Sequence, residues 1–491
     1  MEDLFTSNLT DDSASSNGFG RRIFIKGLGF VSLGLIMGTF GGCEKIIEDI
    51  KNRPIRRRLR SGSPEVDADI DTYRQAVTLM KNLDTSNPGD QRSWLNQATI
   101  HGIPAHFNFC EHSTDHFFDW HRAYLVNFER IIQKLTNKPK FGLPYWNWNQ
   151  DPAIHSAFLD PSSSLFLARN RTSMSGSTST TTAELNPIFA DTNFFTFGSQ
   201  VEGTPHNNVH SYIGGTFGGY ASARDPLFWM HHCMVDYCWA KWNIEMGNNN
   251  TNDSTWLNHP NTHFVDADGN PNSMTAAVTI LLPLLSYQYE SSAIGSSPAK
   301  AEPSKAEFQK LESRLKAGAN VRFEIKQRVR LADKAAVSIA RPLSKETKLS
   351  TNDFASIVNA EAARDKVFVS IEYAQVPPSS DFYVRVYVNL PNANSNTPTT
   401  DPHYAGSFSF FGTAEPNAPA GEHRHQPKFL VNITNTLQRL NRTQAIRAEA
   451  PLSIQLVPVP YSGQFEKADT QLLLEKIEII TTPVIVNPPA E

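Results

Sequence analysis

Cysteine is scarce in this sequence. The chain has 491 residues and only 4 cysteines, which is too few for a disulfide framework. Cys43 belongs to an N-terminal segment, so Cys110, Cys233 and Cys238 remain for the folded part. Cys233 and Cys238 lie in a stretch with a helical pattern, where their spacing directs them to different faces. We therefore expect no bridge between them.

An excess of charge of one sign is also missing. The formal net charge is −4, and charged residues make up 19% of the chain. This balance gives no electrostatic reason to expect nucleic acid or an anionic membrane as a partner, and it leaves small neutral substrates open. Hydrophobic residues make up 40%, which is an ordinary globular composition. At this length, two domains and a leader are the expected organisation.

The N-terminal segment lacks an apolar run of the length and bulk that favour a spanning helix. It reads RRIFIK from Arg21 to Lys26, and a short glycine-rich run extends from Gly27 to Gly42. This pattern is typical of a twin-arginine export signal, which we assign to residues 1–43. We expect a periplasmic or extracellular protein without a transmembrane domain in the mature chain. Cys43 lies where a lipoprotein signal is cut, so a lipid anchor is an alternative.

The hydrophobic pattern changes once along the chain. We assign residues 44–63 to a linker and the start of the first domain, and the pattern from 64 to 290 is mainly helical. Residues 291–305, SSAIGSSPAKAEPSK, have the small, polar composition of an exposed linker. Residues 306–491 contain alternating stretches such as DFYVRVYVN, in which Phe382, Val384, Val386 and Val388 face a core. One short helix, ITNTLQRL, interrupts these strands, and we expect a β-sandwich.

Histidine is plentiful, with 15 residues. A lone histidine is more often a surface or packing residue than a ligand, so spacing decides which ones matter. His206 and His210, at positions i and i+4, share one face of a helix, as two ligands of one metal require. His112 and His121 can share a metal only if His112 lies on a loop and His121 on the next helix, with Asp119 as its cap. All-imidazole clusters suit copper, zinc, iron or nickel.

Two longer segments resemble the signatures of the type-3 copper proteins, the tyrosinases, catechol oxidases and molluscan haemocyanins. They are HSTDHFFDWHRAYLVNFE, residues 112–129, and DPLFWMHHCMVD, residues 225–236. FGLPYWNWNQD and PHNNVHSYIGG lie where the family has similar segments. The resemblance implies a mainly α catalytic domain, in which a four-helix bundle holds two copper ions with O2 as co-substrate.

The resemblance also implies the metal ligands. The first copper ion takes His101, His112 and His121, and the second takes His206, His210 and His232. His106 is the alternative to His101, which we prefer because QATIHGIP resembles the family's segment around its first ligand. The remaining histidines in these segments and in the C-terminal part are expected to pack beside the ligands or to support them by hydrogen bonds, without binding metal: His116, His231, His403, His423 and His425.

Several neighbours of these ligands have implied roles. Cys110 and His112 match the Cys-x-His pattern that forms a thioether in many family members, and the alternative is a buried free thiol. Phe228 is expected to pack against the ligand rings, and Asp236 to orient an imidazole. Tyr237 replaces the arginine that commonly follows this aspartate, so the family's salt bridge is in doubt here.

The resemblance further suggests which phenols are oxidised. Glu202 and Asn207 match the pair that holds a water for deprotonating a monophenol, although a carboxylate at this position also suits any helix start. Gly219 stands where plant catechol oxidases carry a bulky phenylalanine, which indicates an open pocket, with Tyr220 adjacent. We expect oxidation of o-diphenols to o-quinones together with hydroxylation of monophenols.

The C-terminal part resembles the cover domain of plant-type polyphenol oxidases, in segments such as DFYVRVYVNLP, HYAGSF and LVNITNTLQRL. We therefore expect an all-β domain over residues 306–491 that keeps the enzyme latent. A side chain from the segment 408–411 enters the copper site, and detergent, acid or linker cleavage releases it. A catechol oxidase without monophenolase activity and a haemocyanin-like O2-binding protein are the alternatives. A zinc hydrolase is disfavoured, because catalytic zinc usually has fewer imidazole ligands.

Overall fold

The computed structural model describes residues 53–290, 325–358, 365–412 and 426–483. All of them belong to one compact unit, Ile50–Glu491. The expected export signal with Cys43, the linker 291–305, and His423 and His425 lie outside the described residues. Within the part that is described, no helix is both long and apolar enough to cross a bilayer.

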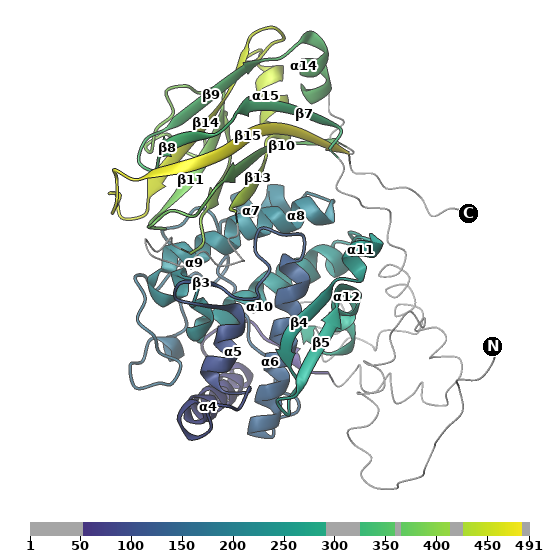
Figure 1. The fold of residues 1–491 in the computed structure, drawn as a ribbon, viewed down its shortest axis with the longest axis vertical. Coiled ribbons are helices and arrows are strands. Elements are labelled where there is room, and N and C mark those ends of the chain that lie inside the picture. Colours follow the sequence, from purple (N-terminus) through teal and green to yellow (C-terminus); the bar gives the residue numbers. More distant parts are fainter. Residues whose placement is uncertain (1–52, 291–324, 359–364, 413–425, 484–491) are drawn as a thin grey trace, which may run out of the picture. The chain divides into compact units, whose positions relative to one another are not determined.

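Residues 53–290 are mainly helical, and their helices pack around a common interior (Figure 1). The helices are α4 (Pro64–Ser86), α5 (Trp94–His101), α6 (Phe117–Thr136), α7 (Thr182–Phe189), α8 (Phe194–Val201), α9 (Asn207–Ile213), α10 (Leu227–Ala240), α11 (Ser254–Leu257) and α12 (Ala276–Leu285). Shorter helical turns are η1 (Ser156–Phe158), η2 (Glu202–His206), η3 (Gly215–Gly218), η4 (Ser222–Arg224) and η5 (Lys241–Glu245). The strands are β1 (Ile55–Arg56), β2 (Gly102–Ile103), β3 (His106–Phe107), β4 (Pro260–Val265), β5 (Pro271–Thr275) and β6 (Gln288–Tyr289).

The described residues after 324 form two antiparallel sheets. One sheet has the order β13 (Lys428–Asn432), β10 (Asp365–Tyr373), β15 (Gln471–Pro483), β7 (Gln327–Ala332), with β8 (Ala335–Ser338) also pairing with β15. The other has the order β12 (Tyr404–Ser409), β11 (Phe382–Val388), β14 (Pro451–Pro460), β9 (Leu343–Lys348). A single apolar core joins the inner faces of both sheets, so this part is a β-sandwich.

A helical region followed by a sheet-rich region is the predicted order, and it is confirmed at that level. The short helix predicted at ITNTLQRL is confirmed as α15 (Thr434–Arg442). A second helix, α14 (Thr351–Val358), was not predicted, so an all-β description of this half is too strong. The expected alternation in β11 is also wrong in part. Tyr387 is fully buried on the face predicted to be exposed, because it packs edge-on against Tyr404 and its hydroxyl donates to the carbonyl of Thr397. The predicted domain limits stay predictions.

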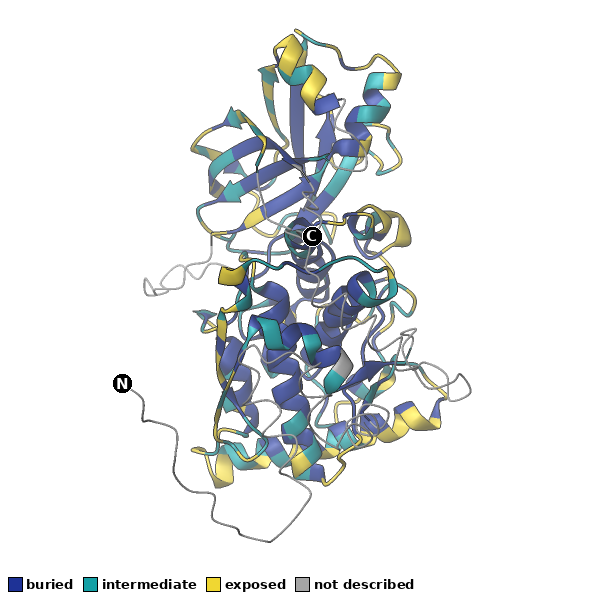
Figure 2. Cartoon of the chain, turned by 90° about the vertical axis from the view of Figure 1, so that its right-hand side faces the viewer, coloured by how far each residue is buried: buried dark blue, intermediate teal, exposed yellow. Residues whose placement is uncertain are grey.

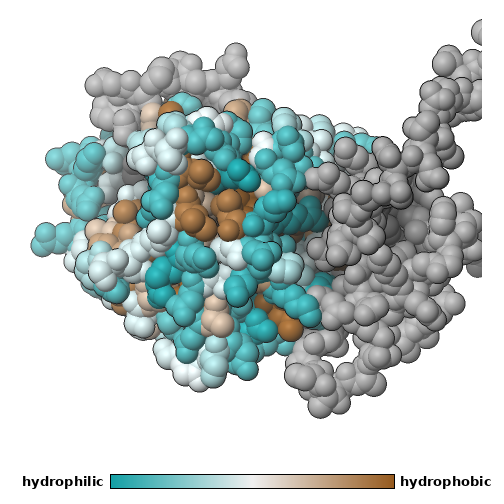
Figure 3. All heavy atoms as spheres, turned by 90° about the horizontal axis from the view of Figure 1, so that it is seen from below, coloured by the Kyte–Doolittle hydropathy of each residue, from teal (hydrophilic) through white to brown (hydrophobic). Residues whose placement is uncertain are grey.

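The two regions differ in where their buried residues lie (Figure 2). In the helical region the interior extends along α6 and α10, in which nearly every side chain is buried. In the sandwich, exposed residues lie in α14, in the loops and along the outer strands β7 and β9 (Figure 2). The helical end seen from below has a mostly hydrophilic surface with small apolar patches (Figure 3). The functional site therefore has to be sought in the polar groups of the interior.

Candidate metal centre

Seven buried histidines meet in the interior of the helical region. His101 ends α5, His112 lies on the loop before α6, and His121 lies one turn into α6. The others come from the segment η2 to α9 and from α10: His206, His210, His231 and His232. Their exposed fractions are all 3% or less. His112 on a loop and His121 on a helix is the arrangement that a shared metal requires.

The backbone between α8 and α9 explains how His206 and His210 reach this interior. Thr204 has an extended conformation (φ −158°, ψ 118°) inside the turn η2, and Pro205 follows it. Because an extended residue and a proline interrupt helical hydrogen bonding, α9 takes a direction independent of α8. His206 and His210 then lie one helical turn apart, and their ring centroids are 4.7 Å from each other.

Oxygen atoms of this chain select the tautomer of five of the six predicted ligands. The Nδ1 atoms of His121 and His210 lie 2.7 Å from the carbonyl oxygens of Phe117 and Phe217. The same nitrogen faces Tyr220 O in His101, Glu202 Oε1 in His112 and Asn207 Oδ1 in His206. A neutral imidazole that donates from Nδ1 carries a lone pair on Nε2. These rings therefore present Nε2 as a metal ligand, with the supporting hydrogen bond that metal-binding histidines usually have.

The Nε2 atoms converge on one another. His101 and His112 face each other with 3.3 Å between their Nε2 atoms, and so do His210 and His232. The Nε2 atoms of His121 and His206 are buried without a protein hydrogen-bond partner. Buried lone pairs that face one another need a cation between them, since a buried polar atom without a partner is costly. The donor set fits soft to intermediate divalent or monovalent metals, copper among them.

Burial keeps these imidazoles uncharged. It lowers the pKa of His121 to about 3, and it lowers the pKa values of His206, His210 and His232 well below the ordinary value of histidine. Neighbouring histidines add to the effect, because a second positive charge in the cluster would be repelled. Neutral rings are the form that binds a metal ion.

The cluster does not separate into the two predicted triads. His101, His121 and His232 have ligand atoms within 4.8 Å of one another, and His206, His210, His231 and His232 form an overlapping group. His121 and His232 stack at a centroid distance of 4.5 Å, which joins the two sets. The structure thus brings all six predicted ligands together without assigning each to one ion.

His231 belongs to the cluster by distance, but its tautomer differs from that of the other rings. The indole Nε1–H of Trp148 donates to its Nδ1 at 3.2 Å. Because a neutral ring that accepts at Nδ1 carries its proton on Nε2, His231 does not present a lone pair there. This supports the packing role expected for it. The alternative ligand His106 lies on β3, half-buried, with Nδ1 near the carbonyl of Phe107.

The other two described histidines assigned to packing lie away from this cluster. His116 stacks on His259 at 3.6 Å and faces Asp119, and His403 contacts the carbonyl of Val388 in the sandwich. The expectation that Asp119 caps α6 is wrong. The helix begins at Phe117, so Asp119 lies in its first turn, where His116 and Asn261 contact its carboxylate.

Glu202 and Asn207 are bound to the ligand rings. Glu202 accepts from the backbone N–H of Ser113 at 2.7 Å and faces His112 Nδ1 at 3.2 Å. Burial raises the pKa of Glu202 to about 8. Asn207 faces His206 through Oδ1, and its amide donates to the carbonyl of Ser409 in β12. Both residues therefore position imidazoles, a role that the sequence pattern did not indicate.

Phe228 and Gly219 also have definite places. Phe228 packs against the rings of His101 and His232, with centroid distances of 4.8 and 4.1 Å. Gly219 directly follows η3, and a Cβ added there would meet only one atom within 4 Å, the carbonyl oxygen of Thr216. The neighbouring Tyr220 lies closer to the centre, because its ring contacts Phe107 and its carbonyl faces His101.

Asp236 does not orient an imidazole, contrary to expectation. Its carboxylate binds the guanidinium groups of Arg122 and Arg56 and the hydroxyls of Tyr287 and Tyr289. Burial raises its pKa, but the charges of Arg122 and Arg56 outweigh that effect and hold the pKa below the ordinary value. Tyr237 carries no positive charge, so the cations that pair with Asp236 are Arg56 of β1 and Arg122 of α6.

Cys110 lies beside the cluster as a buried free thiol. Its sulfur is within 4.8 Å of ligand nitrogens of His101 and His112. Burial raises the pKa of this thiol well above its ordinary value. An uncharged thiol next to an imidazole is therefore the state that the structure describes.

A phenylalanine from the sandwich reaches the histidines. Phe411, 5% exposed, stacks on His210 with a centroid distance of 4.1 Å and an interplanar angle of 19°. It also contacts His112 and His206, at 5.2 and 5.5 Å. Phe408 and Phe410 instead belong to the core of the sandwich. Within the predicted segment 408–411, Phe411 is thus the residue that enters the site.

Comparison with known proteins identifies this centre. The family model described as the common central domain of tyrosinase matches residues 91–184 and 160–245, a range that contains all six predicted ligands. Residues 91–245 thus contain the central domain of the tyrosinases, which are type-3 copper proteins. The protein is therefore a copper-dependent oxidoreductase. Residues 319–481 match a second model, described as a domain of unknown function (DUF7868).

Individual relatives extend over both regions. The chain is 29% identical over 501 residues to a chloroplastic polyphenol oxidase of Malus domestica, covering 85% of this chain and 78% of the relative. It is 26% identical over 474 residues to (+)-larreatricin hydroxylase of Larrea tridentata, covering 84% and 77%. Among solved structures, latent apple tyrosinase matches with a TM-score of 0.58 and 21% identity, covering 88% of this chain and 97% of that one. The type-3 copper fold and the added sandwich therefore occur together elsewhere.

Proposed function

We propose that this protein is a dicopper polyphenol oxidase that oxidises o-diphenols to o-quinones and also hydroxylates monophenols. In the first reaction, two diphenols each lose two electrons and two protons, and one O2 takes up all four of each to give two waters. The observation that carries the proposal is the cluster of buried, neutral imidazoles inside the tyrosinase-type region. The names of the relatives, a polyphenol oxidase among them, support the class of substrate.

The six predicted histidines would hold the two copper ions through Nε2, and α5, α6, α9 and α10 would form the bundle around them. The ions, when bound, supply the activation of O2. The chain's own residues keep the imidazoles neutral and fix their tautomers, so that no proton has to leave before metal binds. Glu202 and Asn207 hold two of the rings, and Glu202 has the raised pKa of a proton acceptor suited to a phenol.

The thioether between Cys110 and His112 is part of the proposal. Its formation joins sulfur to a ring carbon and removes one hydrogen from each, with O2 as the oxidant. The proximity of the Cys110 sulfur to this ring supports it. Peptide mapping of the copper-loaded protein should show the two residues joined and lighter by two hydrogens, whereas an alkylatable Cys110 thiol would contradict the bond.

We further propose that the protein is made latent by its C-terminal sandwich. Phe411 occupies the space beside His210 that a phenol ring would need. Hydrogen bonds hold the strand behind it: Thr204 donates to Ser407, Asn207 to the carbonyl of Ser409, and Asn208 to the Ser409 hydroxyl. Twin-arginine export of the folded, copper-loaded protein would suit such a resting state. A lipid anchor at Cys43 stays an alternative.

Oxygen uptake tests both parts of the proposal. Copper-loaded protein is assayed with a monophenol and a diphenol, before and after cleavage between residues 291 and 305. Cleavage and the substitution Phe411→Ala should each raise diphenol oxidation, at unchanged copper content. Phe465→Ala, which removes a partly buried aromatic side chain that packs against the sandwich core, is the control and should not raise it. Reversible O2 binding without phenol turnover in all forms would favour the haemocyanin-like alternative, and turnover of diphenols alone would favour a catechol oxidase.

A further inference from the structure

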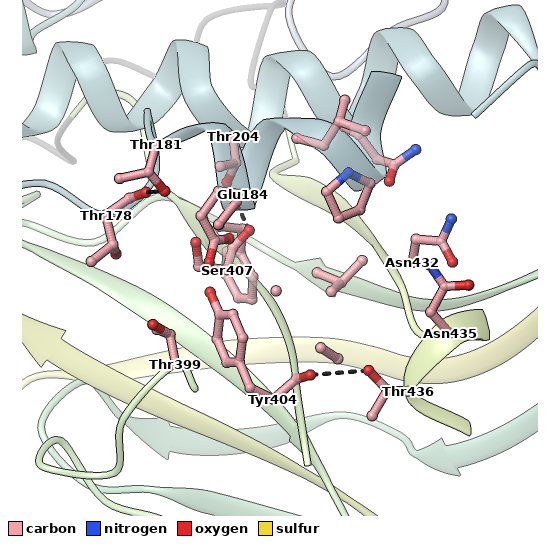
Figure 4. A pocket seen from close by; sticks show the side chains of 18 of the residues that line it. Thr178, Thr181, Glu184, Thr204, Thr399, Tyr404, Ser407, Asn432, Asn435 and Thr436 are labelled. Atoms are coloured by element: carbon pink, nitrogen blue, oxygen red, sulfur yellow. Dashed lines mark hydrogen bonds between the residues drawn. The ribbon is translucent and has the colours of Figure 1, made fainter. Parts of the chain in front are cut away.

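A cavity that is separate from the histidine cluster lies where the helical region meets the sandwich (Figure 4). It has a volume of about 670 Å³, which is the size of a small-molecule site. Glu184 of α7 and Thr204 of η2 line one side, and residues of β12, β13 and α15 line the other. None of the lining residues is a histidine, so the cavity is not part of the metal centre.

The lining is rich in hydroxyl and amide groups. Figure 4 shows such side chains around the cavity, Thr178, Thr181 and Thr204 from the helical region and Thr399, Asn432 and Asn435 from the sandwich. The ring of Tyr404 adds one aromatic surface, and the Glu184 carboxyl faces its hydroxyl. Burial raises the pKa of Glu184 to about 7, so near neutral pH this carboxyl both donates and accepts hydrogen bonds.

This lining selects among ligand classes. Several lining hydroxyls already donate to backbone carbonyls, namely Thr181 to Thr178, Thr204 to Ser407 and Thr436 to Tyr404, and each can still accept a hydrogen bond from a ligand hydroxyl. Glu184, Asp401 and Arg439 lie in the same lining, so the cavity has no excess of one charge that would select an anion or a cation. A molecule that carries many hydroxyls pairs with alternating donors and acceptors and can place one face on an aromatic ring. The chemistry therefore fits a neutral polyol of the size of one or two sugar rings.

We propose that this cavity is a regulatory site for a neutral saccharide-type ligand, and that occupancy holds β12, and with it Phe411, against the metal centre. The inference rests on the proposed latent oxidase. Five consecutive residues of this strand region, 404–408, line the cavity, and Phe411 follows shortly after β12 ends. Thr204 couples the two sides, because its hydroxyl donates to the Ser407 carbonyl at 2.7 Å.

The expected effect of the ligand on activity follows from the fact that both regions line the cavity. A ligand whose site is formed by both regions binds only while the sandwich is docked on the helical region. Its binding free energy therefore stabilises this docked state. Occupancy should therefore deepen latency and lower the activity of the intact protein. A ligand that bound one region alone would leave the docking equilibrium unchanged.

Calorimetry on the copper-loaded full-length protein tests binding directly, with cellobiose and glucose as probes. We expect heat of binding for cellobiose, and roughly tenfold weaker affinity in Glu184→Gln and in Asn435→Ala, because each loses hydrogen bonds to the ligand. Glu346→Gln is the matched control, since Glu346 is an exposed carboxylate on β9, outside the cavity lining, and its affinity should not change. Melting curves of all variants establish that they are folded.

Oxygen uptake with a diphenol tests the coupling. Saturating cellobiose should lower the rate of the intact wild-type protein by at least half, and it should bind Phe411→Ala without lowering its rate. Absence of binding to the wild type, or equal affinity in Glu184→Gln and Asn435→Ala, overturns the site. Binding with no change in the wild-type rate overturns the coupling. Because calorimetry needs no turnover, a failure of the proposed oxidase function is distinguished from a failure of the site.

Discussion

The helical region and the sandwich bury different kinds of side chain. The interior of the helical region contains the histidine cluster and two buried ionic groups, Arg56–Glu129 with Asp236–Arg122, and Arg169–Asp225. The interior that joins the two sheets is almost entirely aliphatic and aromatic. A buried charge needs exact partners, whereas an apolar core needs only volume and pattern. The polar interior thus serves a site of fixed geometry, and the apolar one supports a stable cover.

The junction between the helical region and the sandwich differs from both interiors in the side chains that it contains. Polar contacts dominate it, as in the group formed by Tyr461 with Asn208, Ser211 and Ser409. Arg171 pairs with Asp381 and lies over the rings of Tyr212 and Tyr461. Phe411 is the sandwich residue that joins the apolar core of the helical region. Polar interfaces separate more easily than apolar ones, so the comparison predicts a cover that can detach while both regions stay folded.

Removal of one ligand should have the largest effect. His210→Ala deletes a ring of the cluster, so we expect loss of bound copper and a fall in diphenol oxidation of more than about 100-fold. Metal analysis and oxygen uptake measure the two effects. His403→Ala, a histidine of the sandwich, should change neither. Full activity with two bound metals in the His210 variant would show that the ligand assignment is wrong.

The buried ionic group offers the sharpest test of the difference between the interiors. Asp236→Asn leaves Arg56 and Arg122 without their shared carboxylate, and we expect a loss of about 3–5 kcal/mol in the free energy of unfolding. Urea unfolding of metal-free protein measures it. Asp71→Asn removes an exposed pair with Arg74 and should cost less than about 1 kcal/mol. Similar losses in both variants would contradict the claimed dependence of the helical interior on exact partners.

Glu202 separates two possible roles within the centre. Glu202→Gln keeps an oxygen that accepts from Ser113 and His112 but removes the titratable carboxyl. Monophenol hydroxylation should fall roughly tenfold relative to diphenol oxidation, because only the former requires deprotonation of the phenol. Ser113→Ala leaves the backbone donor and serves as the control. Equal losses on both substrates would leave Glu202 with a positioning role alone.

The sequence could predict the parts of this molecule that depend on local spacing. The i, i+4 pair His206 and His210 and the loop position of His112 follow from neighbouring residues alone. The packing role of His231 was expected, but its tautomer could not be predicted, because the indole of Trp148 decides it. The role of Asp236 could not be predicted either, because its partner Arg56 lies 180 residues away in the chain. In both cases a distant side chain sets the chemistry.

The sandwich shows the same limit. Strands with strong apolar alternation, such as β10 and β14, could be predicted, because each carries its own signal. β9, LSKETK, could not, because it is an edge strand that pairs only with β14 and exposes alternate polar residues. Its conformation comes from backbone pairing with a neighbour. Phe411 could be predicted only in part. The aromatic residues of segment 408–411 indicated that one of them enters the site, and only the packing shows that it is Phe411 and not Phe408 or Phe410.

The smallest predicted effect concerns pH at the junction. Burial raises the pKa of Glu184 to about 7, and the hydrogen bond with Tyr404 of β12 and the charge of Arg385 of β11 partly offset this rise. A group whose pKa is higher in the docked state binds more protons there, so docking is favoured at low pH and weakens as pH rises toward 7. Glu184 therefore opposes the release by acid that the sequence led us to expect.

Diphenol oxidation by the intact protein, divided by that of Phe411→Ala at each pH, should rise roughly threefold between pH 5 and 8. Glu184→Gln should flatten this ratio and Glu346→Gln should not. An unchanged slope in Glu184→Gln would show that Glu184 does not cause the pH dependence.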